Sequence, residues 1–345
     1  MEIKGEKLKN KNSGILNNTI VKILNGMAMG LMSSLVIGVV LKQFGTYLNI
    51  KELILFGQVS QYMLGPAIGA GVALSLDAPP LGVFSAVVCG MLGAGTIKYT
   101  GGSYILGSGE PVGALAASVA GALSSKVVFG KTKCDIIIVP AVAIIIGGLV
   151  GTFVSPYISN FMILIGDMIN RITELKPLPM GVLISVVMGI IITSPISSAA
   201  IAISLGLSGL AAGAATVGCA CHMVGFAVMG YKENGINGLI SHGLGTSKLQ
   251  MANSIKNPFI LVPPIIASAI LGGLAATVFK MVNNKIGAGM GTSGLVGQFS
   301  TIEMMGEKSL VPIVLLHFLF PAILTFFISK IMKKQGLIKI GDMKI

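Results

Sequence analysis

The sequence predicts an all-α polytopic membrane protein, with about ten transmembrane helices, re-entrant hairpins and two repeated halves. Of its 345 residues, 53% are hydrophobic and only 10% are charged, whereas soluble domains carry about 25% charged residues. Several uncharged runs reach the roughly 20 residues that a helix needs to cross a bilayer. Two segments of the chain also match two later ones in the same order. Composition, run length and repetition thus agree on this fold class.

The apolar runs are separated by short polar stretches that contain most of the lysines. Residues 1–18 are polar and lysine-rich and lack the apolar core and cleavage site of a signal peptide, so we expect a cytoplasmic basic tail there. The predicted spans lie near residues 19–41, 53–75, 81–98, 104–125, 135–155, 157–170, 180–200, 206–230, 258–279 and 309–330.

The distribution of basic residues predicts an orientation in the membrane. With the N-terminus in the cytoplasm, ten crossings return the C-terminus to the same side. All but six of the 24 basic residues then face the cytoplasm, as the positive-inside rule requires. The six outside are Lys42, Lys51, Lys98, Lys280, Lys285 and Lys308. We therefore expect a multi-pass membrane protein with both termini cytoplasmic, and this orientation explains the net charge of +12 better than nucleic-acid binding.

Two regions are too polar for lipid-facing spans and too apolar for ordinary loops. Residues 233–256 and 285–307 are rich in Gly, Ser, Thr and Asn. Non-helical backbone at membrane depth is tolerated only inside protein or beside water. We expect re-entrant hairpins in both regions.

Two segments of the chain recur later in it, the first of them at an offset of 129 residues. The segment Pro66–Leu76 aligns without gaps to Pro195–Leu205, and Lys133–Pro140 resembles Lys256–Pro263. Duplicated halves are common in transporters, where broken helices from the two repeats face a substrate near the midplane. The predicted domains are a basic tail (1–18), a first repeat (19–156), a second repeat (157–280), and a re-entrant segment with a final span and tail (281–345).

The stretch Leu106-Gly-Ser-Gly-Glu-Pro111 places one carboxylate in a glycine-broken backbone between apolar segments. A charge at membrane depth costs at least about 2.5 kcal/mol and marks a functional site by default. Glu110, with Ser108 and Gly109, is therefore the first candidate for a ligand contact. The alternative is that Glu110-Pro111 is simply the start of a helix, with an acidic residue in the first turn and an early proline.

Three further Gly- or Pro-broken segments carry hydroxyl side chains. They are His242-Gly-Leu-Gly-Thr-Ser247, Gly289-Met-Gly-Thr-Ser293 and Thr193-Ser-Pro195. Glycine permits a close backbone approach, and Thr and Ser can cap a helix or bind a ligand. A structural kink or a simple N-cap explains each segment without any ligand. The candidate substrate contacts are His242, Gly245, Thr246, Ser247, Thr193, Ser194, Thr292 and Ser293.

Metal and catalytic chemistry find little support in the sequence. Cys219-Ala-Cys221-His222 lacks the spacing and the second pair of a metal site, so small buried thiols explain it better. His222 and His317 fit hydrogen bonding between packed helices better than ligand binding. No pair of nucleophile and base stands out. We expect no metal, no cofactor and no covalent chemistry in this chain.

With these motifs in view, the chain resembles the membrane enzyme IIC component of bacterial sugar phosphotransferase systems, and more narrowly the stand-alone PfoR-like branch. The resemblance implies a homodimeric carrier of the bacterial inner membrane that binds a sugar at a Glu- and His-lined site among re-entrant hairpins. It also implies a transport domain that moves across a fixed scaffold. The sugar-binding Gly-x-x-Glu-Pro motif of the family would fall on Glu110, although in many members that glutamate comes late in the chain. The tails 1–18 and 330–345 are too short for phosphotransfer domains, so we expect those components to be separate proteins or to be absent.

The leading functional hypothesis is an integral membrane carrier for a small polar solute, a sugar or sugar-like compound, working by alternating access. The main alternative is a membrane-bound sugar sensor that signals to a cytoplasmic partner. A channel is the weaker third hypothesis, because no acidic ring or filter-like repeat is evident.

Overall fold

The computed structural model describes residues 19–100, 102–107 and 109–345, and nearly all of its regular structure is helical. By their contacts the residues divide into two compact units, one within Met1–Leu31 and Met63–Ser155 and the other within Met32–Tyr62 and Pro156–Ile345. Six helical stretches of the described residues are long and apolar enough to cross a membrane. They are Thr19–Thr46, Pro111–Val128, Asp135–Val154, Gly209–Met229, Pro258–Thr277 and Ser293–Lys334.

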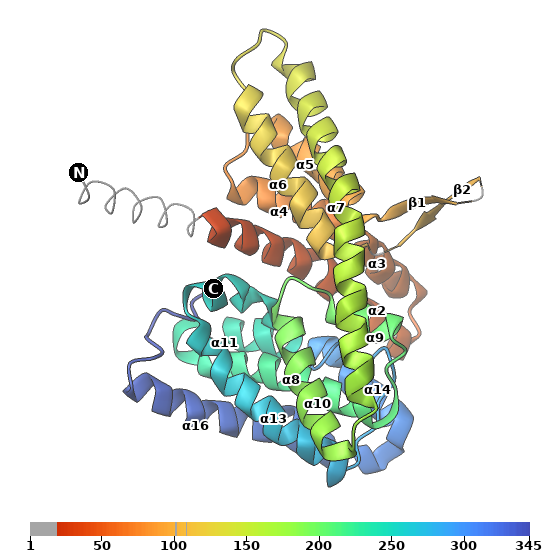
Figure 1. The fold of residues 1–345 in the computed structure, drawn as a ribbon, viewed down its shortest axis with the longest axis vertical. Helices are drawn as coiled ribbons and strands as arrows, with labels where there is room; N and C mark the ends of the chain where they lie inside the picture. The colour runs from red at the N-terminus through yellow and green to blue at the C-terminus, as the bar shows by residue number, and fades with distance from the viewer. Residues whose placement is uncertain (1–18, 101, 108) are drawn as a thin grey trace. The chain divides into compact units, whose positions relative to one another are not determined.

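The first unit is a set of small-residue helices with one β-hairpin. Residues 19–31 form a helix. The remaining elements are α4 (Leu64–Ser75), α5 (Pro80–Ala94), β1 (Ile97–Thr100), β2 (Ser103–Leu106), α6 (Pro111–Val128) and the part of α7 (Asp135–Thr173) that ends at Ser155. Helices α4, α5 and α6 lie against one another (Figure 1). A Cβ atom at Gly69 would overlap the Ala86 carbonyl, so the contact between α4 and α5 requires glycine at this position.

The second unit begins with a π-helical turn at Met32–Val36 and the helix pair α2 (Ile37–Leu48) and α3 (Lys51–Tyr62). The rest of α7 leads to α8 (Pro177–Thr193), α9 (Ser198–Ser204), α10 (Gly209–Met229) and α11 (Tyr231–Ile240). After the turns at Ser241–Gly245 and Ser247–Gln250 follow α12 (Met251–Lys256), α13 (Val262–Thr277), α14 (Val296–Met305), α15 (Leu310–Ile313) and α16 (Phe320–Lys334). Short 3-10 turns at Pro258–Leu261, Ser293–Leu295 and Gly306–Ser309 and a π-helical turn at Val314–Leu319 connect these helices.

Helix α10 is the centre of the second unit, with α8, α13 and α16 packed around it (Figure 1). All of its residues from Ala211 to Ala227 are buried. The small residues of α10 allow the neighbouring helices to pack this closely. At Gly218, for example, a Cβ atom would overlap the carbonyl of Ser185 on α8. The apolar core of α8 and α10 also includes Ile169 from α7. A helix that is apolar on all sides is buried on all sides, so the few polar side chains of α10 lie in the interior.

The structure differs from several of the predicted spans. Residues 135–155 and 157–170 form one continuous helix, α7, because no Gly- or Asn-rich turn separates the two apolar runs. Residues 104–106 form a strand rather than the start of a span, because β2 pairs with β1 in an antiparallel hairpin from Ile97 to Leu106. The predicted span 180–200 ends as a helix at Thr193, where Ser194 is extended. The repeat, the re-entrant placement of residues 233–256 and 285–307, and the number of crossings stay predictions.

Candidate functional site

Helix α8 ends at the Thr193-Ser-Pro195 motif, where its backbone opens. Ser194 has an extended conformation, with φ −79° and ψ 171°. Its hydroxyl donates to the Ile191 carbonyl at 2.7 Å and accepts from the Ile196 amide at 3.2 Å. Proline has no amide hydrogen to continue the helix. The break therefore exposes main-chain carbonyls that the helix itself cannot satisfy.

Lys248 supplies the donor for these carbonyls. Its Nζ donates to the carbonyl oxygens of Ser194 and Ile196, the second at 2.6 Å. The side chain is only 6% exposed. From the distribution of basic residues, Lys248 was expected in a cytoplasmic loop. In the structure its ammonium is buried against the break after α8.

A buried polar cluster, formed by Thr193, His222 and Ser247, lies at the same break. Thr193 Oγ1 is 2.8 Å from His222 Nδ1 and 3.0 Å from Ser247 Oγ. The three residues are 3%, 0% and 0% exposed, respectively. They come from the end of α8, the middle of α10 and the turn Ser247–Gln250. Three segments far apart in the sequence therefore meet through hydroxyl and imidazole groups.

The imidazole of His222 has unused hydrogen-bonding capacity. Among the described residues, its Nε2 has no hydrogen-bond partner. The ring lies directly against α8 at Gly189, where a Cβ atom would come within 2.8 Å of Nε2. A buried polar atom without a partner costs about 1–3 kcal/mol. Such an atom beside a broken helix marks this cluster as a place where a polar ligand would gain a hydrogen bond.

The second Gly-x-Gly-Thr-Ser segment packs against the same helices. Ser198 Oγ donates to the Gly289 carbonyl at 2.6 Å, and Thr292 Oγ1 lies 3.6 Å from Met223 Sδ on α10. Ser293 is 5% exposed. The turns Ser241–Gly245 and Ser293–Leu295 contact each other. The structure thus brings the predicted residues Thr193, Ser194, Gly245, Thr246, Ser247, Thr292 and Ser293 into neighbouring segments of one unit.

Thr246 and Gly245 have local structural roles in this arrangement. Thr246 is extended and its hydroxyl accepts from the Lys248 amide at 3.2 Å, which makes it the N-cap of the turn that follows. A Cβ atom at Gly245 would come within 2.7 Å of the Met32 side chain. The N-cap fixes the backbone of the segment from which Lys248 and Ser247 reach the break after α8.

His242 is fully engaged by the protein itself. Its Nδ1 is 2.8 Å from the Gly238 carbonyl, which only accepts, so Nδ1 carries the hydrogen. Nε2 then accepts from Gln250 Nε2 at 2.9 Å. Gln250 Nε2 also donates to the Met343 carbonyl at 2.9 Å. In this conformation His242 joins the turn Ser241–Gly245 to the C-terminal segment, and its contact with a sugar stays a prediction.

Glu110 lies in the first unit at the start of α6. Its Oε2 accepts from the amides of Val112 and Gly113 at 2.7 and 2.9 Å, so the carboxylate caps the helix. Gly109 adopts a φ of +71° close to Ala94 and Thr96, which favours glycine there. This geometry matches the helix-start alternative, while the role of Glu110 as a sugar ligand stays a prediction. Ser108 lies outside the described residues.

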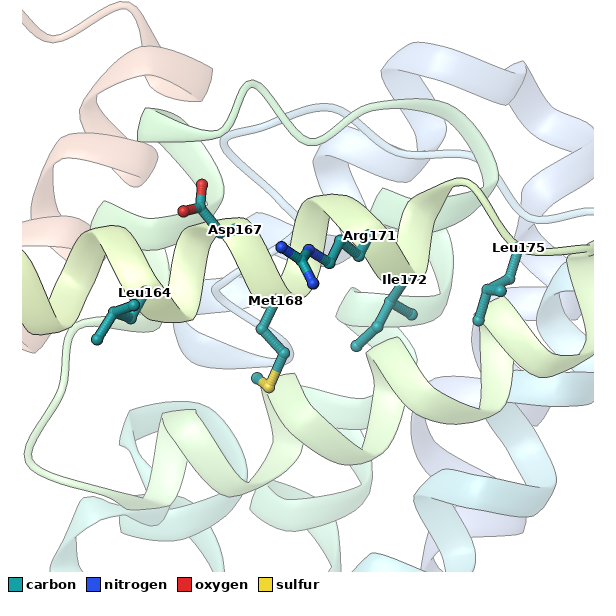
Figure 2. Close-up of a pocket in the computed structure, with 6 residues that line it drawn as sticks. All are labelled: Leu164, Asp167, Met168, Arg171, Ile172 and Leu175. Carbon is teal, nitrogen blue, oxygen red and sulfur yellow. The ribbon is translucent and has the colours of Figure 1, made fainter.

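A pocket of about 510 Å³ lies along the second part of α7. None of the residues that line it belongs to the polar cluster. Figure 2 shows the six side chains that line it, five from α7 and that of Leu175 just after the helix ends, with Asp167 and Arg171 one turn apart. The other four residues are Leu164, Met168, Ile172 and Leu175. Walls this apolar offer a sugar few hydrogen bonds, and a sugar site needs several convergent polar groups. The polar cluster is accordingly the better candidate.

Several buried polar residues were not predicted from the sequence. His222 was expected to be a packing residue, and Lys248, Gln250 and Gln298 were not singled out. Gln298 Nε2 is 2.9 Å from His317 Nδ1, and in the described part of the chain neither His317 Nε2 nor Gln298 Oε1 has a partner. The signal available was the rarity of intramembrane histidine, but the partners become visible only in three dimensions.

No metal site is evident in the described residues. No group of three or more His, Cys, Asp or Glu side chains among them could hold an ion. Cys219 Sγ instead lies 3.5 Å from the Met188 carbonyl. Cys219 Sγ also lies 3.8 Å from the Ala288 carbonyl, so its described contacts are with main-chain carbonyls.

One comparison with known proteins gives a result that covers almost the whole chain. The family model described as "Phosphotransferase system, EIIC" matches residues 21–345. No curated protein and no solved structure matches the chain.

Proposed function

This chain belongs to the phosphotransferase system EIIC family, and we propose that it binds its sugar at the Thr193–His222–Ser247 cluster. The family implies the sugar-transporting permease component of a phosphotransferase system, a multi-pass membrane protein that works with partner phosphotransferase components. The specific proposal concerns where the sugar is held and what moves.

The observation that carries the proposal is the open hydrogen-bonding capacity at a helix break. Thr193 and Ser247 offer hydroxyl groups, and His222 Nε2 has no partner among the described residues. Sugar hydroxyls both donate and accept, so they complement a mixed set of this kind. Transporters commonly place their substrate at discontinuous helices, and α8 ends at this cluster.

Transport then follows from alternating access around this cluster. Residues 233–256 and 285–307 form re-entrant hairpins in the proposal, and their Gly-x-Gly-Thr-Ser segments bring Thr246, Ser247, Thr292 and Ser293 to the solute. Glu110 and His242 are further candidate contacts. The protein works as a homodimer with both termini cytoplasmic, within the PfoR-like branch of the family, and separate proteins perform any phosphate transfer.

The test is sugar binding to purified protein after a single isosteric change. Thr193→Val keeps the shape of the side chain and removes its hydroxyl, so the affinity for the transported sugar should fall by about tenfold or more. Thr325→Val is the matched control, because Thr325 is also buried and its hydroxyl bonds within α16, to the Pro321 carbonyl. Equal affinities for the two folded variants would place the sugar elsewhere. Before this comparison, calorimetry of the wild-type protein with a panel of hexoses, amino sugars and hexitols identifies the sugar that it binds.

Ser247→Ala provides a second, independent variant. Ser247 is fully buried and contacts Thr193, and losing its hydroxyl leaves the backbone of the turn intact. Sugar affinity should fall while the melting temperature of the free protein changes little. A large loss of melting temperature with unchanged affinity would instead mean that Ser247 only joins α8 to the turn.

A further inference from the structure

The ammonium of Lys248 occupies an unusual place for a positive charge. It lies at the carboxyl end of α8, with hydrogen bonds to the carbonyls of Ser194 and Ile196. The carboxyl end of a helix carries a partial negative charge of about half an electron. Lys248 is 6% exposed, so these carbonyls take over much of the role that water plays for an exposed lysine.

Carbonyls of this kind are ligands for free monovalent cations in other transporters. Unwound backbone and the carboxyl ends of half-helices coordinate sodium ions or protons in several transporter folds. Here a covalently tethered cation already has that position. The tether is itself well placed, because the Thr246 hydroxyl caps the Lys248 amide at 3.2 Å.

We propose that the Lys248 ammonium is a built-in monovalent cation for the break after α8, in the position that a free sodium, potassium or ammonium ion would take. Shortening the side chain converts this position into a binding site for a free cation. The charge thus joins the break to the segment Gly245–Lys248, alongside the hydrogen bond between Thr193 and Ser247. This inference goes beyond the proposed sugar site and does not depend on which sugar is carried.

Thermal unfolding of the purified full-length chain tests this without any sugar. Lys248→Ala should lower the melting temperature by several degrees in a buffer whose only cation is choline, since two part-buried carbonyls lose their donor. Adding methylammonium, ammonium, potassium or sodium should restore the melting temperature with a saturating dose dependence. The wild-type chain should show no such response.

Two variants separate a specific site from a general effect of salt. Lys248→Met keeps most of the side-chain volume but has no charge, so it should be destabilised and should not respond to small cations. Lys256→Ala removes an exposed lysine on α12 and should behave like the wild-type chain. Restoration confined to Lys248→Ala supports the built-in cation.

Two results would overturn the inference. One is a Lys248→Ala chain that unfolds at the wild-type temperature in choline. The other is a destabilised chain that no small cation stabilises, or that additional choline at the same concentration stabilises equally well. If Lys248→Ala folds only with methylammonium, the protein can be purified with it and then exchanged into choline. Unfolding on exchange supports the proposal, whereas persistent folding contradicts it.

Discussion

Single hydroxyl, imidazole and ammonium groups decide the chemistry of this protein's interior. Thr193, His222, Ser247 and Lys248 are buried and converge on the end of α8. The sequence predicted the hydroxyl residues, because Gly, Pro, Thr and Ser clusters interrupt apolar runs visibly. It did not predict the role of Lys248, because a lysine between apolar segments has the same local pattern whether it points to water or into the fold.

Glu110 is the residue for which two roles can be separated by two substitutions. Glu110→Gln keeps a side-chain oxygen that can accept from the Val112 and Gly113 amides, so the stability of α6 should change little. Glu110→Ala removes the cap and should lower the free energy of unfolding by about 1 kcal/mol. Chemical denaturation of the purified variants measures both values.

Sugar affinity then decides between the roles of Glu110. If the carboxylate also binds the sugar, both variants should bind it at least about tenfold more weakly, because a hydrogen bond to a charged acceptor is lost. Wild-type affinity in folded Glu110→Gln would leave Glu110 with the capping role alone.

Among the elements, α10 is one that hydropathy described well. Its small and apolar residues predicted a span near 206–230, and the structure has a buried helix at Gly209–Met229. The hairpin β1–β2 and the single helix α7 were predicted less well. Hydropathy reports which residues avoid water, but it reports neither strand pairing nor the absence of a turn.

Glycine at position 218 allows α8 and α10 to pack closely. Gly218→Ala would place a Cβ atom against the Ser185 carbonyl, and over-packing of this kind costs about 1–3 kcal/mol. The melting temperature should therefore fall. Gly243→Ala is the control, because its Cβ atom would meet the Ala227 side chain at 3.6 Å, an ordinary contact. Equal melting temperatures for the two variants would mean that α8 and α10 separate at little cost.

The C-terminal segment is attached to the turns around His242 by side-chain amides. Gln250 and Asn253 donate to the carbonyls of Met343 and Lys344, and Asn257 donates to Leu337. Gln250→Leu should therefore speed hydrogen exchange of the amides in residues 336–345. Gln335→Leu, which changes an exposed glutamine, should leave the exchange as in the wild-type chain. Unchanged exchange in Gln250→Leu would show that the side-chain amides of Asn253 and Asn257 are sufficient to hold the C-terminal segment in place.

At the scale of the whole molecule, the family assignment explains the long apolar helices and the buried polar groups together. A permease must cross the membrane and also hold a polar solute within it. The predicted duplication and the pairing of breaks from two halves stay predictions. A repeat in apolar sequence rests on few distinctive residues, so sequence alone could not establish it.

Reconstitution separates a permease from a sensor. Proteoliposomes that contain the chain should accumulate the bound sugar, either alone or when partner phosphotransferase proteins are enclosed. Thr193→Val liposomes should take up less, and Thr325→Val liposomes should match the wild type. Specific binding without flux under either condition would favour a membrane-bound sensor that signals to a cytoplasmic partner.

A density map of the wild-type protein saturated with its sugar tests the account most directly. We expect sugar density within hydrogen-bond distance of at least two of the groups Thr193 Oγ1, His222 Nε2 and Ser247 Oγ. Sugar density in the α7 pocket beside Asp167 and Arg171, with the polar cluster unchanged, would contradict the proposed site.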